Sequence, residues 1–242
     1  MSRGQVDAPC CLGTVHQGEL KGKQLELGPL TTYVTGDESP GGRAVLIIPD
    51  VYGFNIPNTR LYADQLAAEG MLVLLPDIFH GDALSEGFDK SQFAEWMQKH
   101  PQDTQVNQLD RLLTDMHQQF KPRSVSCIGF CWGGLHACKL ASSGRVSAAV
   151  VAHGSFITKE AIEAVKQPLL FLFPDRDQMI PEDFRKEIEG IMAKKQQPTK
   201  GKFYPGCAHG WTIRGDPSDP KQRENAADAF AETVSWLKTH AA

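Results

Sequence analysis

Short apolar runs alternate along the chain with longer segments in which apolar residues recur every three or four positions. The short runs are typical of strands buried on both faces, and the longer segments are typical of crossover helices. The buried strands are expected at residues 44–48, 71–75, 124–128, 147–152, 169–173 and 202–204. An antiparallel hairpin, residues 24–27 and 30–34 joined by Gly28 and Pro29, is expected before them. This pattern predicts an α/β fold, a mostly parallel central sheet flanked by helices on both faces.

Two of the predicted helices have a clear apolar stripe, one at residues 102–119 and one at the end of the chain. The stripe residues are Leu109, Leu112, Leu113 and Met116 in the first helix, and Phe230, Val234 and Leu237 in the last. Asn58 suits the N-cap of a further helix, and Pro181 suits a first helical turn. Residues 201–220 are rich in Gly, Pro and polar side chains, which favours a long loop of functional interest.

Composition narrows the class of protein. A chain of 242 residues with 41% hydrophobic content is long enough for one domain with a sizeable core, expected over residues 1–242. The net charge of -4 comes from interspersed charges, so neither a nucleic-acid surface nor a membrane-binding basic run is expected. The start lacks an apolar leader, and no stretch approaches the roughly 18 apolar residues needed to cross a bilayer. We therefore expect a cytoplasmic protein with a small-molecule partner, either a monomer or a homodimer.

Six cysteines are too few for a disulfide scaffold of this length, and none forms a CxxC pair with metal spacing. Reduced thiols and no metal site are expected. Cys127 and Cys138, with His136, are expected in the core. Cys10 and Cys11 are expected to be packed or exposed thiols, because adjacent side chains do not readily converge on one metal.

The segment from Gly129 to Gly133, GFCWG, carries the strongest chemical signal. It follows the run at 124–128 and opens a helical segment, which is the arrangement of a nucleophile elbow with Cys131 in the position of the usual serine. Glycine at both ends permits the sharp turn, and a helix N-terminus beneath the thiol favours the thiolate. A buried cysteine in an ordinary strand-to-helix turn is the alternative for this motif taken alone.

An acid and a base follow the elbow in the order of an α/β-hydrolase triad. Asp177 lies in the loop after the strand at 169–173, and His209 follows the last predicted strand. His209 is the candidate general base, and Asp177 is favoured over Asp175 as its orienting acid because it lies nearer the next helix. His153 also follows a strand and is the rival base, but it precedes the acid in the chain. Taken alone, Asp177 would more often be a helix cap, and His209 would more often be a solvated turn residue. Their joint occurrence after successive strands, downstream of the elbow, favours a catalytic role.

Together with the elbow, three further segments resemble the dienelactone hydrolase (carboxymethylenebutenolidase) family of the α/β-hydrolase superfamily. They are residues 48–55, the Asp177 loop and residues 208–211. The similarity runs over nearly the whole chain. Cys10-Cys11 and the segments 75–82, 153–156 and 209–216 are closest to a eukaryotic branch known from fungi.

The resemblance implies the α/β-hydrolase fold, no cofactor, and Cys131, Asp177 and His209 as nucleophile, acid and base. It further implies an oxyanion hole formed by the backbone N–H groups of Trp132 and Val51.

Other positions of the family pattern bear on the substrate. In bacterial members a glutamate contacts the resting thiol, and the matching residue here is Asp50. Those members also bind a substrate carboxylate through arginines, and Phe79 and His80 stand where one of these is found. Arg214 could be a remaining anion anchor, with an exposed arginine in a polar loop as the alternative. The apolar walls are expected from Tyr52, Phe79 and Trp211, with His153 lining the pocket.

Two functions of different class are consistent with these residues. The first is a cofactor-independent thiol hydrolase that opens a small ester or lactone through an acyl-enzyme on Cys131. The second is a catalytically weak binding or redox-responsive protein in which Cys131 is an oxidisable thiol. No dinucleotide-binding GxGxxG or P-loop follows the first central strand. A thiol sensor needs no His and Asp in triad geometry, so the order of Asp177 and His209 favours the hydrolase.

Overall fold

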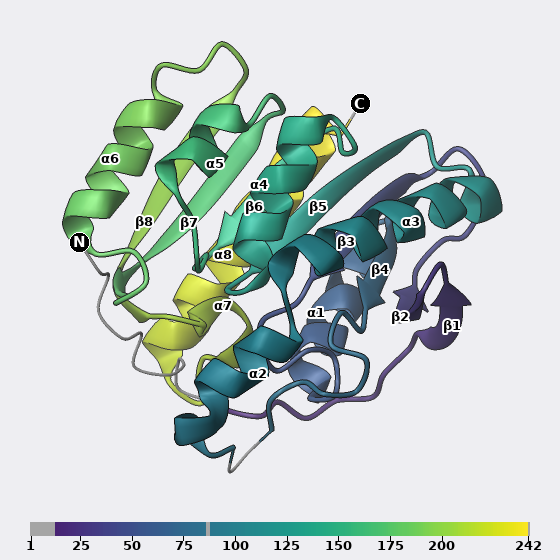
Figure 1. Ribbon diagram of the computed structural model, residues 1–242, viewed down its shortest axis with the longest axis horizontal. Helices are drawn as coiled ribbons and strands as arrows, with labels where there is room; N and C mark the ends of the chain where they lie inside the picture. Colours follow the sequence, from purple (N-terminus) through teal and green to yellow (C-terminus); the bar gives the residue numbers. More distant parts are fainter. Residues whose placement is uncertain (1–12, 86–87, 242) are drawn as a thin grey trace.

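The computed structural model describes residues 13–85 and 88–241, and an eight-stranded sheet forms its centre (Figure 1). The strands lie in the order β1-β2-β4-β3-β5-β6-β7-β8. Their bounds are β1 Lys23–Leu27, β2 Leu30–Thr35, β3 Arg43–Ile48, β4 Leu72–Pro76, β5 Ser124–Phe130, β6 Ala149–Ala152, β7 Leu169–Arg176 and β8 Thr199–Ala208. The pairs from β4 to β8 are parallel, and β1 and β2 join the β4 edge antiparallel. The predicted fold class, including the amino-terminal hairpin, is confirmed.

Helices cover both faces of the sheet, as Figure 1 shows. Their bounds are α1 Pro57–Ala68, α2 Phe93–Lys99, α3 Gln102–Phe120, α4 Gly133–Ser143, α5 Lys159–Ala164, α6 Glu182–Met192, α7 Trp211–Arg214 and α8 Pro220–His240, with a 3-10 turn at Lys90–Gln92. Helices α3 to α6 pack on one face, and α1, α7 and α8 on the other. All residues of β4, β5 and β6 are buried, which explains why these strands appear in the sequence as continuous apolar runs.

The segment at 201–220 is more ordered than predicted. Strand β8 extends to Ala208, and α7 forms one turn at Trp211–Arg214. Strand β8 lies at the sheet edge with most of its side chains exposed or half-exposed, so its sequence is polar and has no continuous apolar run. A helix of one turn is too short to produce a helical periodicity. The long loop expected here is therefore wrong, although the segment does carry His209.

The predicted N-cap role of Asn58 is wrong. Helix α1 has Ile56 at its N-cap and Pro57 in its first turn. The Asn58 amide instead donates to the carbonyl of Thr14 at 2.7 Å and to that of Ile213 at 2.8 Å. Its Oδ1 accepts the backbone N–H of His16 at 3.0 Å. Asn58 therefore links the amino-terminal segment and α7 to α1 through hydrogen bonds. Because α7 begins two residues after His209, these bonds also fix the position of the loop that carries His209.

Within residues 13–85 and 88–241, no helix combines the length and the apolar character that a membrane span requires. Cys10 and Cys11 lie outside the described residues.

Candidate active site

Cys131 lies in a sharp turn between β5 and α4. Its φ of 49° is left-handed, a strained conformation for a non-glycine residue. The turn is closely packed: a Cβ on Gly129 would lie 2.2 Å from the carbonyl oxygen of Gly133, and one on Gly133 would lie 2.2 Å from that of Ile48. Only glycine fits at either position. The turn thus holds Cys131 at the carboxyl end of β5 and presses the start of α4 against the end of β3.

His209 and Asp177 are brought together from the ends of β8 and β7. Nδ1 of His209 lies 2.8 Å from Oδ2 of Asp177, and the Asp177 side chain is fully buried. The second carboxylate oxygen accepts the backbone N–H of Met179 at 2.8 Å, which fixes the carboxylate in one orientation. A carboxylate at Nδ1 places the ring proton on that nitrogen and leaves Nε2 as the basic atom.

Asp175 has a different environment from Asp177. It is exposed, and its Oδ2 accepts the backbone N–H of Gly206 at 2.9 Å. The structure therefore pairs His209 with Asp177 and leaves Asp175 exposed near the end of β7.

Ser155 was not among the sequence candidates, yet its hydroxyl oxygen lies 3.3 Å from the Cys131 sulfur. It follows His153 in the loop after β6, and its backbone N–H donates to the Cys131 carbonyl at 2.8 Å. The only sequence signal was its position two residues after a strand-end histidine. Both Ser155 and Cys131 are buried, at 1% and 2% exposure, so their contact is shielded from water.

His153 is fully buried behind His209, and its backbone is left-handed with φ of 40°. Its ring centre lies 5.0 Å from that of His209, and Nε2 lies 2.7 Å from the hydroxyl of Thr212. Burial, with a smaller contribution from the neighbouring His209, holds the pKa of His153 well below the ordinary value. His153 is therefore neutral near pH 7 and packs against His209 as an uncharged ring.

Asp50 and Arg214 form a buried ion pair between the loop after β3 and α7. Oδ1 of Asp50 also accepts the backbone N–H of Tyr52 at 2.9 Å, and the Arg214 guanidinium lies 5.0 Å from the centre of the Tyr52 ring. The Arg214 side chain is 1% exposed. The alternative of an exposed surface arginine is therefore wrong.

The remaining candidate site residues differ in how exposed their side chains are. Trp132 follows Cys131 at the N-cap of α4, and its indole N–H donates to Gln105 at 2.7 Å; Val51 is buried after β3. Phe79 is fully buried, with its ring centre 5.9 Å from that of Trp132. Trp211 is also buried, 5.5 Å from the His153 ring. His80 is exposed, and Gln108 of α3 donates to its ring.

Cys127, Cys138 and His136 have no role in this chemistry. Cys127, Cys138 and His136 are fully buried, as predicted. Burial raises the pKa of Cys138 to about 12 and also raises that of Cys127, while it lowers the pKa of His136 to about 4. Among the described residues, no group of three His, Cys, Asp or Glu side chains could hold a metal ion.

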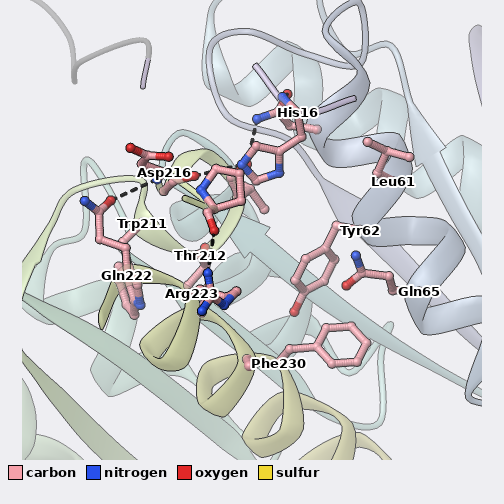
Figure 2. Close-up of a pocket in the computed structure, with 16 residues that line it drawn as sticks. His16, Leu61, Tyr62, Gln65, Trp211, Thr212, Asp216, Gln222, Arg223 and Phe230 are labelled. Atoms are coloured by element: carbon pink, nitrogen blue, oxygen red, sulfur yellow. Dashed lines mark hydrogen bonds between the residues drawn. The ribbon is translucent and has the colours of Figure 1, made fainter. Parts of the chain in front are cut away.

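Two pockets adjoin the loop that carries His209. One of about 170 Å³ is lined by His209, Arg214 and Cys207 among others. A larger one of about 330 Å³ lies between α1, α7 and the start of α8, with Tyr62, Phe230 and Trp211 among its walls (Figure 2). Cys131 lines neither pocket. The larger pocket is connected to the candidate site only through Thr212, which lines the pocket and contacts His153.

Comparison with known proteins identifies the relatives of this chain. The dienelactone hydrolase family model matches residues 30–241, which is most of the sequence. The chain belongs to the dienelactone hydrolase family. Membership of this family supports an ester or lactone hydrolase, and the resemblance noted in the sequence is confirmed.

Individual relatives of this dienelactone hydrolase family member are distant but match end to end. The chain is 28% identical to the hydrolase pyvD of Aspergillus violaceofuscus over 96% of both chains. It is 27% identical to the carboxymethylenebutenolidase homolog of Homo sapiens, over 99% of this chain and 100% of the relative. The structure of dienelactone hydrolase from Anabaena variabilis superposes with a TM-score of 0.66 at 15% identity, covering 94% of this chain and 100% of that one. At that identity the superposition shows the fold alone.

Proposed function

We propose that this protein hydrolyses small esters or lactones through an acyl-enzyme on Cys131, with His209 as general base and Asp177 as orienting acid, in one α/β-hydrolase domain. One observation carries the proposal: the 2.8 Å contact between His209 Nδ1 and the buried Asp177 carboxylate. This contact lies at the carboxyl ends of the parallel strands, as does the strained Cys131 turn. A base so oriented, downstream of a nucleophile elbow, is the arrangement that acyl transfer requires.

In the proposed first step, Nε2 of His209 removes the proton from the Cys131 thiol and the sulfur attacks the substrate carbonyl carbon. The S–H bond breaks, and N–H and S–C bonds form. Negative charge develops on the carbonyl oxygen, where the backbone N–H groups of Trp132 and Val51 are the proposed donors. The C–O bond to the leaving group then breaks, and His209 returns its proton to the departing oxygen.

In the second step, water attacks the thioester while His209 removes a proton from it. The C–S bond breaks, the acid product leaves, and the proton returns to the sulfur. Asp177 keeps its charge throughout and stabilises the imidazolium that forms twice in each cycle. No resident metal or cofactor enters this scheme, because the chain's own thiol, imidazole and N–H groups supply the nucleophile, the proton carrier and the charge stabilisation.

The redox-responsive alternative makes no use of the Asp177–His209 contact. A thiol sensor needs an accessible low-pKa cysteine, but it needs no buried carboxylate that orients an imidazole. The short contact between these two side chains therefore supports the enzyme over the sensor.

The direct test is a screen of the purified protein against small aryl esters, thioesters and lactones, followed by rapid quenching and intact-mass measurement. We expect a mass increase equal to the acyl group, located on the peptide that contains Cys131. Hydrolysis of a substrate without any adduct on that peptide, even when deacylation is slowed at low pH, would contradict the covalent mechanism.

The substrate pocket is proposed to be walled by Tyr52, Phe79 and Trp211, with His153 behind the base and His80 at its outer margin. Arg214 is the proposed anchor for a substrate carboxylate, since it lines the small pocket that His209 also lines. Its charge is balanced at rest by Asp50. An anionic substrate would therefore have to compete with Asp50 for the guanidinium.

Replacing Arg214 with alanine is expected to destabilise the fold by about 3–5 kcal/mol, because it leaves the buried Asp50 carboxylate without its counterion. Chemical denaturation measures the change. The double variant Asp50→Asn/Arg214→Met removes both charges and should recover most of the lost stability. A single variant as stable as the wild type would contradict the buried ion pair.

The double variant also separates stability from recognition. If Arg214 anchors a carboxylate, this variant should show a raised KM for carboxylate-bearing esters and an unchanged KM for neutral aryl esters. Equal effects on both substrate types would assign specificity to pocket shape alone.

A further inference from the structure

We propose that Ser155 is a catalytic group of this site: its hydroxyl donates a hydrogen bond to the Cys131 sulfur and stabilises the thiolate from which attack begins. The inference rests on the proposed function of Cys131 as nucleophile. It concerns a residue that neither the triad nor the oxyanion hole includes. The observation behind it is the 3.3 Å contact between the Ser155 oxygen and the Cys131 sulfur.

The loop that carries Ser155 is fixed independently of this contact. The Ser155 N–H donates to the Cys131 carbonyl at 2.8 Å, and the Cys131 N–H donates to the Ala152 carbonyl at 3.2 Å. Close packing adds to this, since a Cβ on Gly134 would lie 2.8 Å from the Cα of Gly154. The backbone therefore sets the distance between hydroxyl and sulfur, and a change of the Ser155 side chain leaves that framework intact.

The direction of the hydrogen bond follows from the chemistry of the sulfur. In the resting thiol either group can donate. When His209 takes the thiol proton, the sulfur keeps only lone pairs, so the Ser155 O–H becomes the donor and retains its own proton. A hydrogen bond to a charged acceptor is stronger than one between neutral groups, and both residues are buried from water. The contact is therefore worth more to the thiolate than to the thiol.

Other ionisable groups around Cys131 also influence its charge. His209 with Asp177 lies at the carboxyl ends of β8 and β7, and Asp50 with Arg214 lies between the β3 loop and α7. His153 precedes Ser155 in its own loop, and burial keeps its pKa well below the ordinary value. Among these, His209 is the proposed acceptor of the thiol proton, so the charge of the sulfur is coupled to that of the imidazole. A test of Ser155 must therefore be made with and without the His209 imidazole.

The experiment is an ultraviolet titration of thiolate absorbance from about pH 5 to about pH 10, taken as the difference between each protein and its Cys131→Ala counterpart. We expect Ser155→Ala to move the midpoint upward by about one pH unit, a tenfold lower thiolate fraction at pH values below both midpoints. The shift should persist in a His209→Ala background. Ser155→Thr, which keeps the hydroxyl, should restore the wild-type midpoint.

Ser126→Ala is the matched control, because Ser126 is a fully buried hydroxyl on β5, the strand that leads to Cys131, and it contacts Ser147 rather than the site. It should leave the midpoint unchanged. If Ser155→Ala does not fold, Ser155→Gly removes the same hydroxyl and is expected to give the same shift. An unchanged midpoint in the folded variant, or an equal shift in Ser126→Ala, would overturn the proposal.

Failure of this inference can be told apart from failure of the proposed function. The titration follows the thiol without any substrate, whereas ester hydrolysis by Cys131→Ala tests the nucleophile. If Cys131→Ala is inactive and the titration of Ser155→Ala is normal, only the role of Ser155 is wrong. If Cys131→Ala retains full hydrolysis, the proposed function is wrong, whatever the titration gives.

Discussion

Replacing Cys131 with alanine is expected to lower kcat/KM for small aryl esters by about four orders of magnitude or more, because it removes the proposed nucleophilic sulfur. Steady-state hydrolysis measures the loss. Cys131→Ser keeps a nucleophilic oxygen but should also be much slower than wild type, since a hydroxyl is far less acidic than a thiol. Both variants change one small buried side chain, so far-ultraviolet circular dichroism should show an unchanged fold.

Cys138→Ala is the matched control for this prediction. Cys138 is as deeply buried as Cys131, but it lies on α4 with its pKa raised by burial to about 12. It should retain wild-type kinetics, and iodoacetamide should label Cys131 faster than Cys138 or Cys127. Substantial turnover in Cys131→Ala, or equal loss in Cys138→Ala, would contradict the assignment of the nucleophile.

The central sheet could be predicted because its strands are buried on both faces. Residues of β4, β5 and β6 are all buried, and a continuous apolar run is the direct consequence. For β8 the sequence predicts only residues 202–204 of the ten that form the strand, because an exposed edge strand needs few apolar residues. Asn58 shows a third case: a good N-cap residue is used for long-range hydrogen bonds to Thr14 and Ile213, and nothing local in the sequence specifies those partners.

The residues of the candidate site also differ in how far the sequence alone predicts them. The elbow glycines, Cys131 and His209 stand out because motif and chain order constrain them together. The choice between Asp175 and Asp177 depended on position in a loop, and the structure separates them through burial and the contact with His209. Ser155 had no motif of its own. Its relation to Cys131 arises from a loop between β6 and α5 meeting the elbow, which is a tertiary contact across 24 residues.

The second large effect is expected from replacing His209 or Asp177. His209→Ala is expected to lower the acylation rate by about 10³- to 10⁴-fold or more, since it removes the proposed acceptor of the thiol proton, and Asp177→Asn should lower it about as much. Asparagine keeps the volume and can still accept the Met179 N–H. Its amide, however, cannot stabilise the imidazolium and can donate to Nδ1, which favours the wrong tautomer of the ring. Stopped-flow release of the aryl alcohol measures this step.

Asp175→Asn is the control that the chain itself offers, because the two aspartates lie two residues apart, at the end of β7 and just after it, and only Asp177 contacts His209. It should acylate at the wild-type rate, and all three variants should melt within a few degrees of wild type. The double variant Asp177→Asn/His209→Ala should be no slower than His209→Ala alone, since the carboxylate acts through the imidazole and has nothing left to orient. Additive losses in the double variant, or a larger loss from Asp175→Asn than from Asp177→Asn, would show that His209 and Asp177 do not act as one unit.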